Sequence, residues 1–332
     1  MPIWGMVLGG YPRSRYVRHT LRDEERGEVR VGEPVKAIML GASTVIGAQV
    51  SAGLRFISDG MLDWHDIFRP FAEAWRNVAV DGLLRYFDNN FFYRIPVFLD
   101  EPEPTRPVLS PRVRLFKELV EPGDLKVVVP GPVTFARLSD NKSGMDIYEL
   151  AERIAFALEV EVREAVNAGA RVVQVDEPFL ADVDATRDDA VLAAELAGRF
   201  SKLGATTILA VYFNMPEPSV YEAMLDAKVD YIAVDVIDAP ERASRIISSK
   251  GYGGHKPVLG LIDARRVMDD RLGYITDIAS KLALDAEEVG ITTSAWLDLI
   301  PYRYSLRKTI LVGRAVELVA ERMSQPVISH WG

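Results

Sequence analysis

Residues 147–178 read IYELAERIAFALEVEVREAVNAGARVVQVDEP, and this stretch contains one complete unit of the pattern that decides the fold. Apolar residues recur at close to 3.6-residue spacing along its first part, which predicts a helix over 147–168. Asp146 precedes that helix as an N-cap, and Gly169 follows it as a C-terminal stop. The run Arg171–Val175 is nearly all apolar, which is typical of a buried parallel strand.

The same alternation extends in both directions along the chain. Seven more apolar, β-branched runs are predicted strands, namely Ile3–Gly9, Arg55–Ser58, Leu125–Val129, Thr206–Val211, Tyr231–Asp235, Pro257–Ile262 and Ile291–Ser294. Further helices are predicted over 188–203, 272–288 and 304–322. Eight strand–helix units in 332 residues indicate an α/β fold, a single (β/α)8 TIM barrel over 1–332. The alternative is a doubly wound sheet, but the glycine-rich phosphate turn that it would carry after the first strand is missing.

Two stretches are longer than one connecting helix requires. Residues 14–34 are highly charged and are expected to form an excursion after the first strand. After the second strand we expect the aromatic, acidic segment Trp64–Phe98 to form helices that cover one end of the barrel. The proline-rich passage 101–107 is expected to be an exposed loop. The barrel should therefore carry helical and loop insertions after strands one and two.

Composition excludes several classes of function. The chain has 39 Lys and Arg against 48 Asp and Glu, so its net charge is −9, which argues against a nucleic-acid partner. It has no cysteine, which excludes disulfides, thiolate nucleophiles and cysteine-ligated zinc. Its four histidines form no spaced metal-binding pair, so no metal ligand is predicted. We see no signal peptide and no apolar run that could span a membrane, and we expect a cytoplasmic protein with no membrane contact.

Polar residues collect where the predicted strands end. In a TIM barrel these ends meet at one mouth, where active sites lie. Four carboxylic acids are candidate catalytic residues: Asp176, Glu177, Asp235 and Asp263. Six more residues are candidates for binding a small-molecule ligand: Arg13, Asp59, Tyr212, Arg265, Trp296 and Asp298.

Each of these candidates also has a structural explanation. Asp176-Glu177-Pro178 could cap the next helix, and Asp263 could pair with Arg265. Asp235 could form an ion pair with an arginine of the helix that follows it. The sequence leaves these alternatives open.

Four motifs then point to a known family. They are GYPR at 10–13, RYFDNNFFYRIP at 85–96, GPVTF at 131–135 and QVDEP at 174–178. Together they resemble cobalamin-independent methionine synthase, which is built of two related (β/α)8 barrels. The resemblance covers nearly the whole chain but only one barrel of the family, and it is greatest to the N-terminal barrel.

The resemblance implies which ligands to expect. The family's catalytic barrel holds zinc on a His-x-Cys pair, a Glu and a later Cys, and the matching positions here are Val211, Phe213, Asp235 and Ala295. Zinc is therefore not expected, and no tightly bound cofactor is implied. The N-terminal barrel helps to hold the polyglutamate tail of a methyltetrahydrofolate donor, which adds Arg18, Arg85 and Asn89 to the predicted binding residues.

Three functions remain open at this stage. In the first, the chain is the non-zinc half of a methionine synthase, and its partner is a separate zinc-bearing barrel. In the second, it is a stand-alone methyltransferase or a uroporphyrinogen-decarboxylase-like enzyme that uses a metal-free site of carboxylates and arginine. In the third, it is a folded relic with a structural role.

Overall fold

The computed structural model describes residues 1–87, 89, 91–121, 123–283 and 286–323. Eight parallel strands form one sheet in the order β1-β11-β10-β9-β8-β7-β5-β2. Their bounds are β1 Ile3–Gly5, β2 Phe56–Ile57, β5 Asp124–Pro130, β7 Val172–Asp176, β8 Thr206–Val211, β9 Tyr231–Asp235, β10 Lys256–Ile262 and β11 Val289–Thr293. Each strand follows its neighbour in the chain around the sheet, which is the topology of a (β/α)8 barrel.

The barrel closes between β1 and β2, which are the two end strands of that order. Met6 forms a parallel bridge with Phe56, and the N–H of Arg55 donates to the carbonyl of Gly5 at 2.9 Å. These contacts join the two ends of the sheet, and the prediction of a TIM barrel is confirmed.

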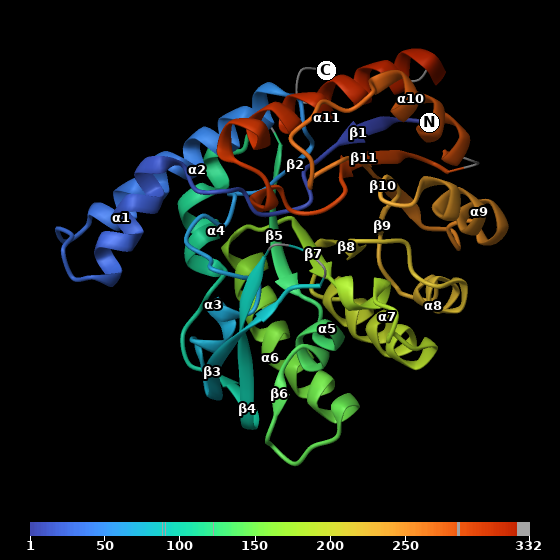
Figure 1. The fold of residues 1–332 in the computed structure, drawn as a ribbon. Helices are drawn as coiled ribbons and strands as arrows, with labels where there is room; N and C mark the ends of the chain where they lie inside the picture. Colours follow the sequence, from blue (N-terminus) through green and yellow to red (C-terminus); the bar gives the residue numbers. More distant parts are fainter. Residues whose placement is uncertain (88, 90, 122, 284–285, 324–332) are drawn as a thin grey trace.

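Helices surround the barrel (Figure 1). Their bounds are α1 Arg15–Glu25, α2 Glu33–Ser51, α3 Arg69–Ala72, α4 Ser110–Phe116, α5 Pro132–Arg137, α6 Ile147–Ala168, α7 Arg187–Ser201, α8 Pro218–Met224, α9 Pro240–Lys250, α10 Leu272–Leu282 and α11 Tyr302–Met323. The predicted bounds of α6 are confirmed. The Asp146 side chain accepts from the N–H groups of Tyr148 and Glu149, and Gly169 ends the helix with a φ of 114°.

The prediction of helices over 64–98 was wrong. Apart from the short helix α3, this insertion forms an antiparallel hairpin of β3 (Trp75–Arg85) and β4 (Phe92–Pro104), which β6 (Asp140–Asn141) extends. Figure 1 shows the hairpin projecting from the barrel. The β-branched and aromatic residues of the segment favour strands, and β4 buries Tyr93, Val97 and Phe98. The proline-rich passage is not wholly a loop either, because β4 continues to Pro104.

The strands of the barrel are buried along most of their length and are mainly apolar, but Lys126, Gln174 and Asp176 are among their buried polar residues. Among the described residues, no helix is both long and apolar enough to cross a membrane.

Candidate functional site: the barrel mouth

Asp176, the last residue of β7, is the centre of a buried hydrogen-bond network. Its side chain accepts from Gln174 Nε2 at 2.6 Å, from the Tyr212 hydroxyl at 3.0 Å and from Trp296 Nε1 at 2.9 Å. Asp176 is completely buried, and burial raises its pKa, while these donors and a nearby lysine oppose the rise. By accepting these three hydrogen bonds, the Asp176 carboxylate holds the side chains of Tyr212 and Trp296 in place.

The lysine is Lys126 of β5, which lies inside the barrel. Its ammonium group donates to the carbonyls of Val7 and Leu8 at 2.8 and 2.9 Å, and to Gln174 Oε1 at 2.5 Å. Burial lowers the pKa of Lys126, and the charge of Asp176 opposes that shift. Gln174 bonds to both ionisable groups, and the opposite charge of each group offsets part of the free-energy cost of burying the other.

Glu177 explains why two of the four sequence motifs occur together. Its carboxylate accepts from the N–H groups of Val133 and Thr134, at 3.0 and 2.7 Å, at the start of α5. A Cβ atom on Gly131 would lie 2.0 Å from the Glu177 carboxyl carbon, so only glycine leaves room for this contact. Burial raises the pKa of Glu177 to about 7. Glu177 thus joins two loops of the mouth.

A glycine pair supports Trp296 in a similar way. Cβ atoms on Gly9 and Gly10 would lie 2.2 and 2.7 Å from atoms of the Trp296 indole. The indole therefore lies directly on the backbone that follows β1. Beside it is a small cavity of about 20 Å³, and its walls include Tyr86, Tyr212 and Asp298. Burial raises the pKa of Asp298 to about 7.

A second group of predicted residues lies after β9 and β10. Asp235 is buried and accepts from the N–H of Asp238 at 3.2 Å, and Asp238 forms an ion pair with Arg265. Burial and the neighbouring Asp238 carboxylate raise the pKa of Asp235. The partner of Arg265 is therefore Asp238 rather than Asp263.

Asp263 has a local structural role. Its carboxylate accepts from the N–H groups of Arg265 and Arg266 at 2.8 and 3.2 Å, and so shapes the loop after β10. The same loop is fixed to α11 by Asp270, which pairs with the buried Lys308 at 2.7 Å.

The residues near the first two strands are also held by neighbours. Arg13 donates to the carbonyls of Leu62 and Trp64 at 2.7 and 2.9 Å. Asp59 pairs with Arg112 at 2.8 Å, and the same guanidinium reaches Asp63 at 2.5 Å.

The residues predicted to bind a polyglutamate tail lie further out. Arg18 is exposed on α1. Arg85 is exposed at the end of β3, and its Nε donates to the carbonyl of Asn89 at 3.0 Å. Asn89 lies in the connection between β3 and β4 and is buried. The structure therefore separates the predicted site residues into clusters, and only Asp176, Tyr212, Trp296 and Asp298 gather around one cavity.

Sequence reasoning missed Lys126, Gln174 and Arg112. A signal existed for the first two, because each is a polar residue within an otherwise apolar strand and must find a partner inside the barrel. Arg112 gave no such signal, since it lies among surface-type residues of α4.

The residues that the resemblance places at the family's zinc positions do not fit zinc. Val211 ends β8, Phe213 follows two residues later, and Ala295 lies just beyond β11. None of these three side chains carries a donor atom, and Asp235 alone cannot provide a tetrahedral site. In the part of the chain that the structure describes, no group of three or more His, Cys, Asp or Glu side chains could hold a metal ion.

The fold and the mouth define the structural class of the protein. It is a (β/α)8 barrel with a preorganised polar network at the C-terminal ends of its strands. The family model described as cobalamin-independent synthase, N-terminal domain, matches residues 54–286. The chain therefore belongs to the cobalamin-independent methionine synthase family.

Known proteins resemble the chain over nearly its whole length. The methionine synthase of Sulfurisphaera tokodaii is 24% identical over 333 residues, which cover 96% of this chain and 92% of the relative. That of Sulfolobus acidocaldarius is 24% identical over 322 residues, covering 96% and 93%. The structure of a B12-independent methionine synthase from a Shewanella species, in complex with selenomethionine, matches with a TM-score of 0.78 at 15% identity, covering 97% and 98%. At that identity the structural match shows the fold alone.

Proposed function

We propose that this chain is the non-zinc half of a split cobalamin-independent methionine synthase, and that a separate zinc-bearing barrel completes the enzyme. One observation carries the proposal. At the ends of β8 and β11 the chain has Val211, Phe213 and Ala295, at the positions that the family resemblance matches to the zinc ligands of the catalytic barrel.

The chemistry explains why that difference matters. The thiol of homocysteine has an ordinary pKa of about 8.5 and must lose its proton before it can accept a methyl group. Zinc coordination removes that proton, which makes sulfur a strong nucleophile at neutral pH. No side chain at Val211, Phe213 or Ala295 can take over this task. A second chain that carries the zinc would supply it.

In this proposal the mouth contributes binding rather than bond making. A methyltetrahydrofolate-type donor with a polyglutamate tail would place its carboxylates near Arg18 and Arg85, which are exposed. An arginine can grip a carboxylate with two parallel hydrogen bonds. Asp176 and Glu177 then act as positioning residues, because both carboxylates are buried and already occupied by donors.

The test uses this full chain and a zinc-bearing barrel of the same family from the same source. Methionine formation from homocysteine and a methyltetrahydrofolate donor is measured for each chain alone and for the mixture, together with their association by analytical ultracentrifugation. We expect a complex and a rate at least tenfold above that of the zinc barrel alone. An unchanged rate with no association would contradict the proposal.

The variant Arg85→Ala separates donor binding from association. It should weaken donor binding by roughly 1–3 kcal/mol without preventing the two chains from associating. A matched control is Arg171→Ala, an exposed arginine near the start of β7 at the opposite end of the barrel. Equal effects of the two changes would remove Arg85 from the site.

A further inference from the structure

Helix α1 carries a row of exposed arginines on its outer face. Each arginine of the row is followed by the next after three or four residues, which places all of them on one side of the helix. The row consists of Arg15, Arg18, Arg22 and Arg26, the last of which is the C-terminal cap. The opposite side of the helix is buried against α2 and includes Val17.

The row is far from the barrel core but begins close to the mouth. Figure 1 shows α1 at the outer edge of the molecule, beyond the helices that surround the barrel. Its first turn is nevertheless fixed at the mouth. Arg13 donates to the carbonyls of Leu62 and Trp64, and Ser14 caps the helix by accepting from the N–H of Val17 at 3.3 Å. A molecule bound to the arginine row would therefore lie beside the mouth.

The arginine row works against the stability of α1. Like charges four residues apart on a helix repel each other, and this spacing separates Arg18 from Arg22 and Arg22 from Arg26. Among the described residues only Arg22 of the row forms an ion pair, with Asp23 at 2.8 Å. Glu25 faces a histidine of the mouth instead of the row. A row of repelling charges that is left mostly unpaired indicates a partner that neutralises it.

The exposed face of α6 has a different arrangement of charge. There Arg153 follows Glu149 by four residues and pairs with it at 3.7 Å, and it also reaches Glu101 at 3.3 Å. Helix α6 thus neutralises its own arginine, which is the ordinary pattern of a solvated helix. Solubility alone therefore does not require the unpaired row on α1.

We propose that the arginine row of α1 is the docking face for an acidic surface of the zinc-bearing barrel, an inference that rests on the function proposed above. Charge complementarity selects the partner, because arginines are matched by carboxylates and can grip each of them with two parallel hydrogen bonds. Arginine is also enriched in protein interfaces. The position beside the mouth suits a partner that must bring its zinc to the bound donor.

A nucleic acid is a poorer match for the same face. The whole chain has a net charge of −9, and acidic residues lie within or shortly after α1, namely Asp23, Glu24, Glu25 and Glu28. A continuous row of phosphates would be repelled by these side chains and by the charge of the chain as a whole. A protein surface can place its carboxylates opposite the arginines and avoid the acidic positions.

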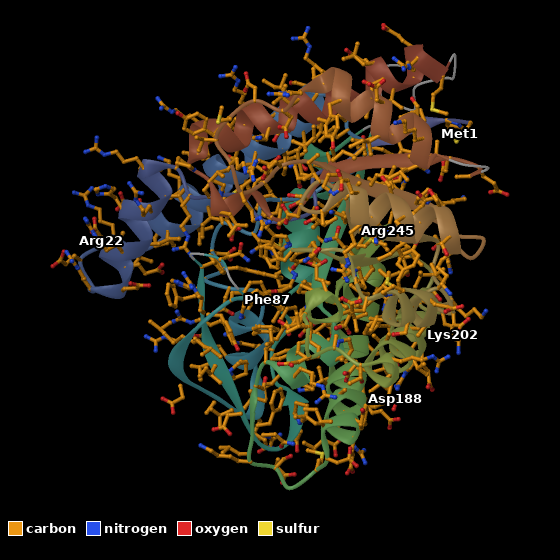
Figure 2. The ribbon with its side chains drawn as sticks, turned by 45° about the vertical axis from the view of Figure 1, so that its right-hand side comes forward. Met1, Arg22, Phe87, Asp188, Lys202 and Arg245 are labelled. Atoms are coloured by element: carbon orange, nitrogen blue, oxygen red, sulfur yellow. The ribbon has the colours of Figure 1, made fainter. Side chains whose placement is uncertain are left out.

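The test measures the rate at which the full chain associates with the zinc-bearing barrel of the same source, by surface plasmon resonance at low and at high ionic strength. The double variant Arg22→Glu/Arg26→Glu reverses two charges of the row and leaves Arg18, which is assigned to the donor, unchanged. The matched control is Arg163→Glu/Arg245→Glu, with exposed sites on α6 and α9 and the same change in net charge. Figure 2 labels Arg245 far from Arg22.

We expect the wild type to associate at least about tenfold faster at low than at high ionic strength, because salt screens the attraction between the two surfaces. The row variant should associate at least about tenfold more slowly than the wild type, and the control should change less than about threefold. Equal losses in the two variants, or an unchanged rate in the row variant, would overturn the docking face and leave the split enzyme standing. No association of the wild type would overturn both.

Two further measurements complete the test. A dimer of the lone wild-type chain in analytical ultracentrifugation, abolished in the row variant, would overturn the proposal, because the row would then bind a second copy of this chain. Far-UV circular dichroism reports whether the variants stay folded. If the reversed charges unfold α1, Arg22→Gln/Arg26→Gln removes the charges and keeps good helix formers, and it should still slow association at least about threefold.

Discussion

Replacing Asp176 by Asn tests the network that holds the mouth together. Asp176 accepts three hydrogen bonds, one on Oδ1 from Gln174 and two on Oδ2 from Tyr212 and Trp296. An asparagine has one oxygen, so its amide must turn its own donors toward at least one of these donors. The change also removes the negative charge nearest to the buried Lys126.

The size of the effect follows from these contacts. Losing one hydrogen bond to a charged group costs about 1.5–3 kcal/mol. Asp176 and Lys126 are connected through Gln174, so removal of the carboxylate also leaves the buried ammonium group without its nearest opposite charge, which adds to the cost. We therefore expect Asp176→Asn to lower the free energy of unfolding by roughly 3–5 kcal/mol at pH 7.

The assay is urea denaturation of the wild type, Asp176→Asn, Lys126→Met and the double variant. If the two groups compensate each other, the double variant should be more stable than the sum of the single effects predicts, by about 1–3 kcal/mol. Strictly additive effects, or a loss below 1 kcal/mol for Asp176→Asn, would refute the reasoning.

Three further changes probe the packing around the mouth. Gly9→Ala should lower the free energy of unfolding by about 1–3 kcal/mol and shift the fluorescence of Trp296, because the new Cβ has no room beside the indole. Gly47→Ala, on an open face of α2, is the control, and in the same denaturation assay it should be neutral or stabilise the protein by up to about 1 kcal/mol. Lys308→Met should lower stability by about 3–5 kcal/mol, because it leaves a buried carboxylate unpaired, and a loss under 1 kcal/mol would show that the pair is not needed. Burial raises the pKa of Glu177 from 4.5 to about 7, so Glu177 binds an extra proton in the folded state, and its contribution to stability should fall by about 3 kcal/mol as pH rises from 4.5 through 7. Other buried carboxyl groups with raised pKa values, such as Asp298, lose stability over the same range, so Glu177→Gln should show a smaller fall than the wild type rather than none. Parallel pH profiles of the wild type and this variant would contradict the assignment.

The barrel strands could be predicted because burial on both faces leaves a strong apolar signal. Thr206–Val211 and Tyr231–Asp235 match the structure at both ends. The helix Ile147–Ala168 was predictable because its period, its N-cap and its terminal glycine agree. The hairpin was not, because β3 is mostly exposed and its pattern is set by pairing with β4 rather than by burial.

The candidate site was predictable in position but not in role. The rule that active sites lie at strand ends led to Asp176, Tyr212 and Trp296. It could not show that Asp176 accepts three hydrogen bonds, because two of the donors, Tyr212 and Trp296, follow β8 and β11 and meet Asp176 only in the folded barrel. The cavity and its aromatic walls depend on the hairpin, which the sequence pattern did not predict.

The central claim is that this chain cannot activate a thiol by itself, because it lacks donor atoms at Val211, Phe213 and Ala295. The most direct measurement is calorimetric titration of the metal-free full chain with zinc, followed by metal analysis after dialysis and an assay for methionine formation. We predict no stoichiometric zinc and no methionine from the lone chain. One tightly held zinc ion per chain, together with methionine formation from homocysteine, would contradict the claim.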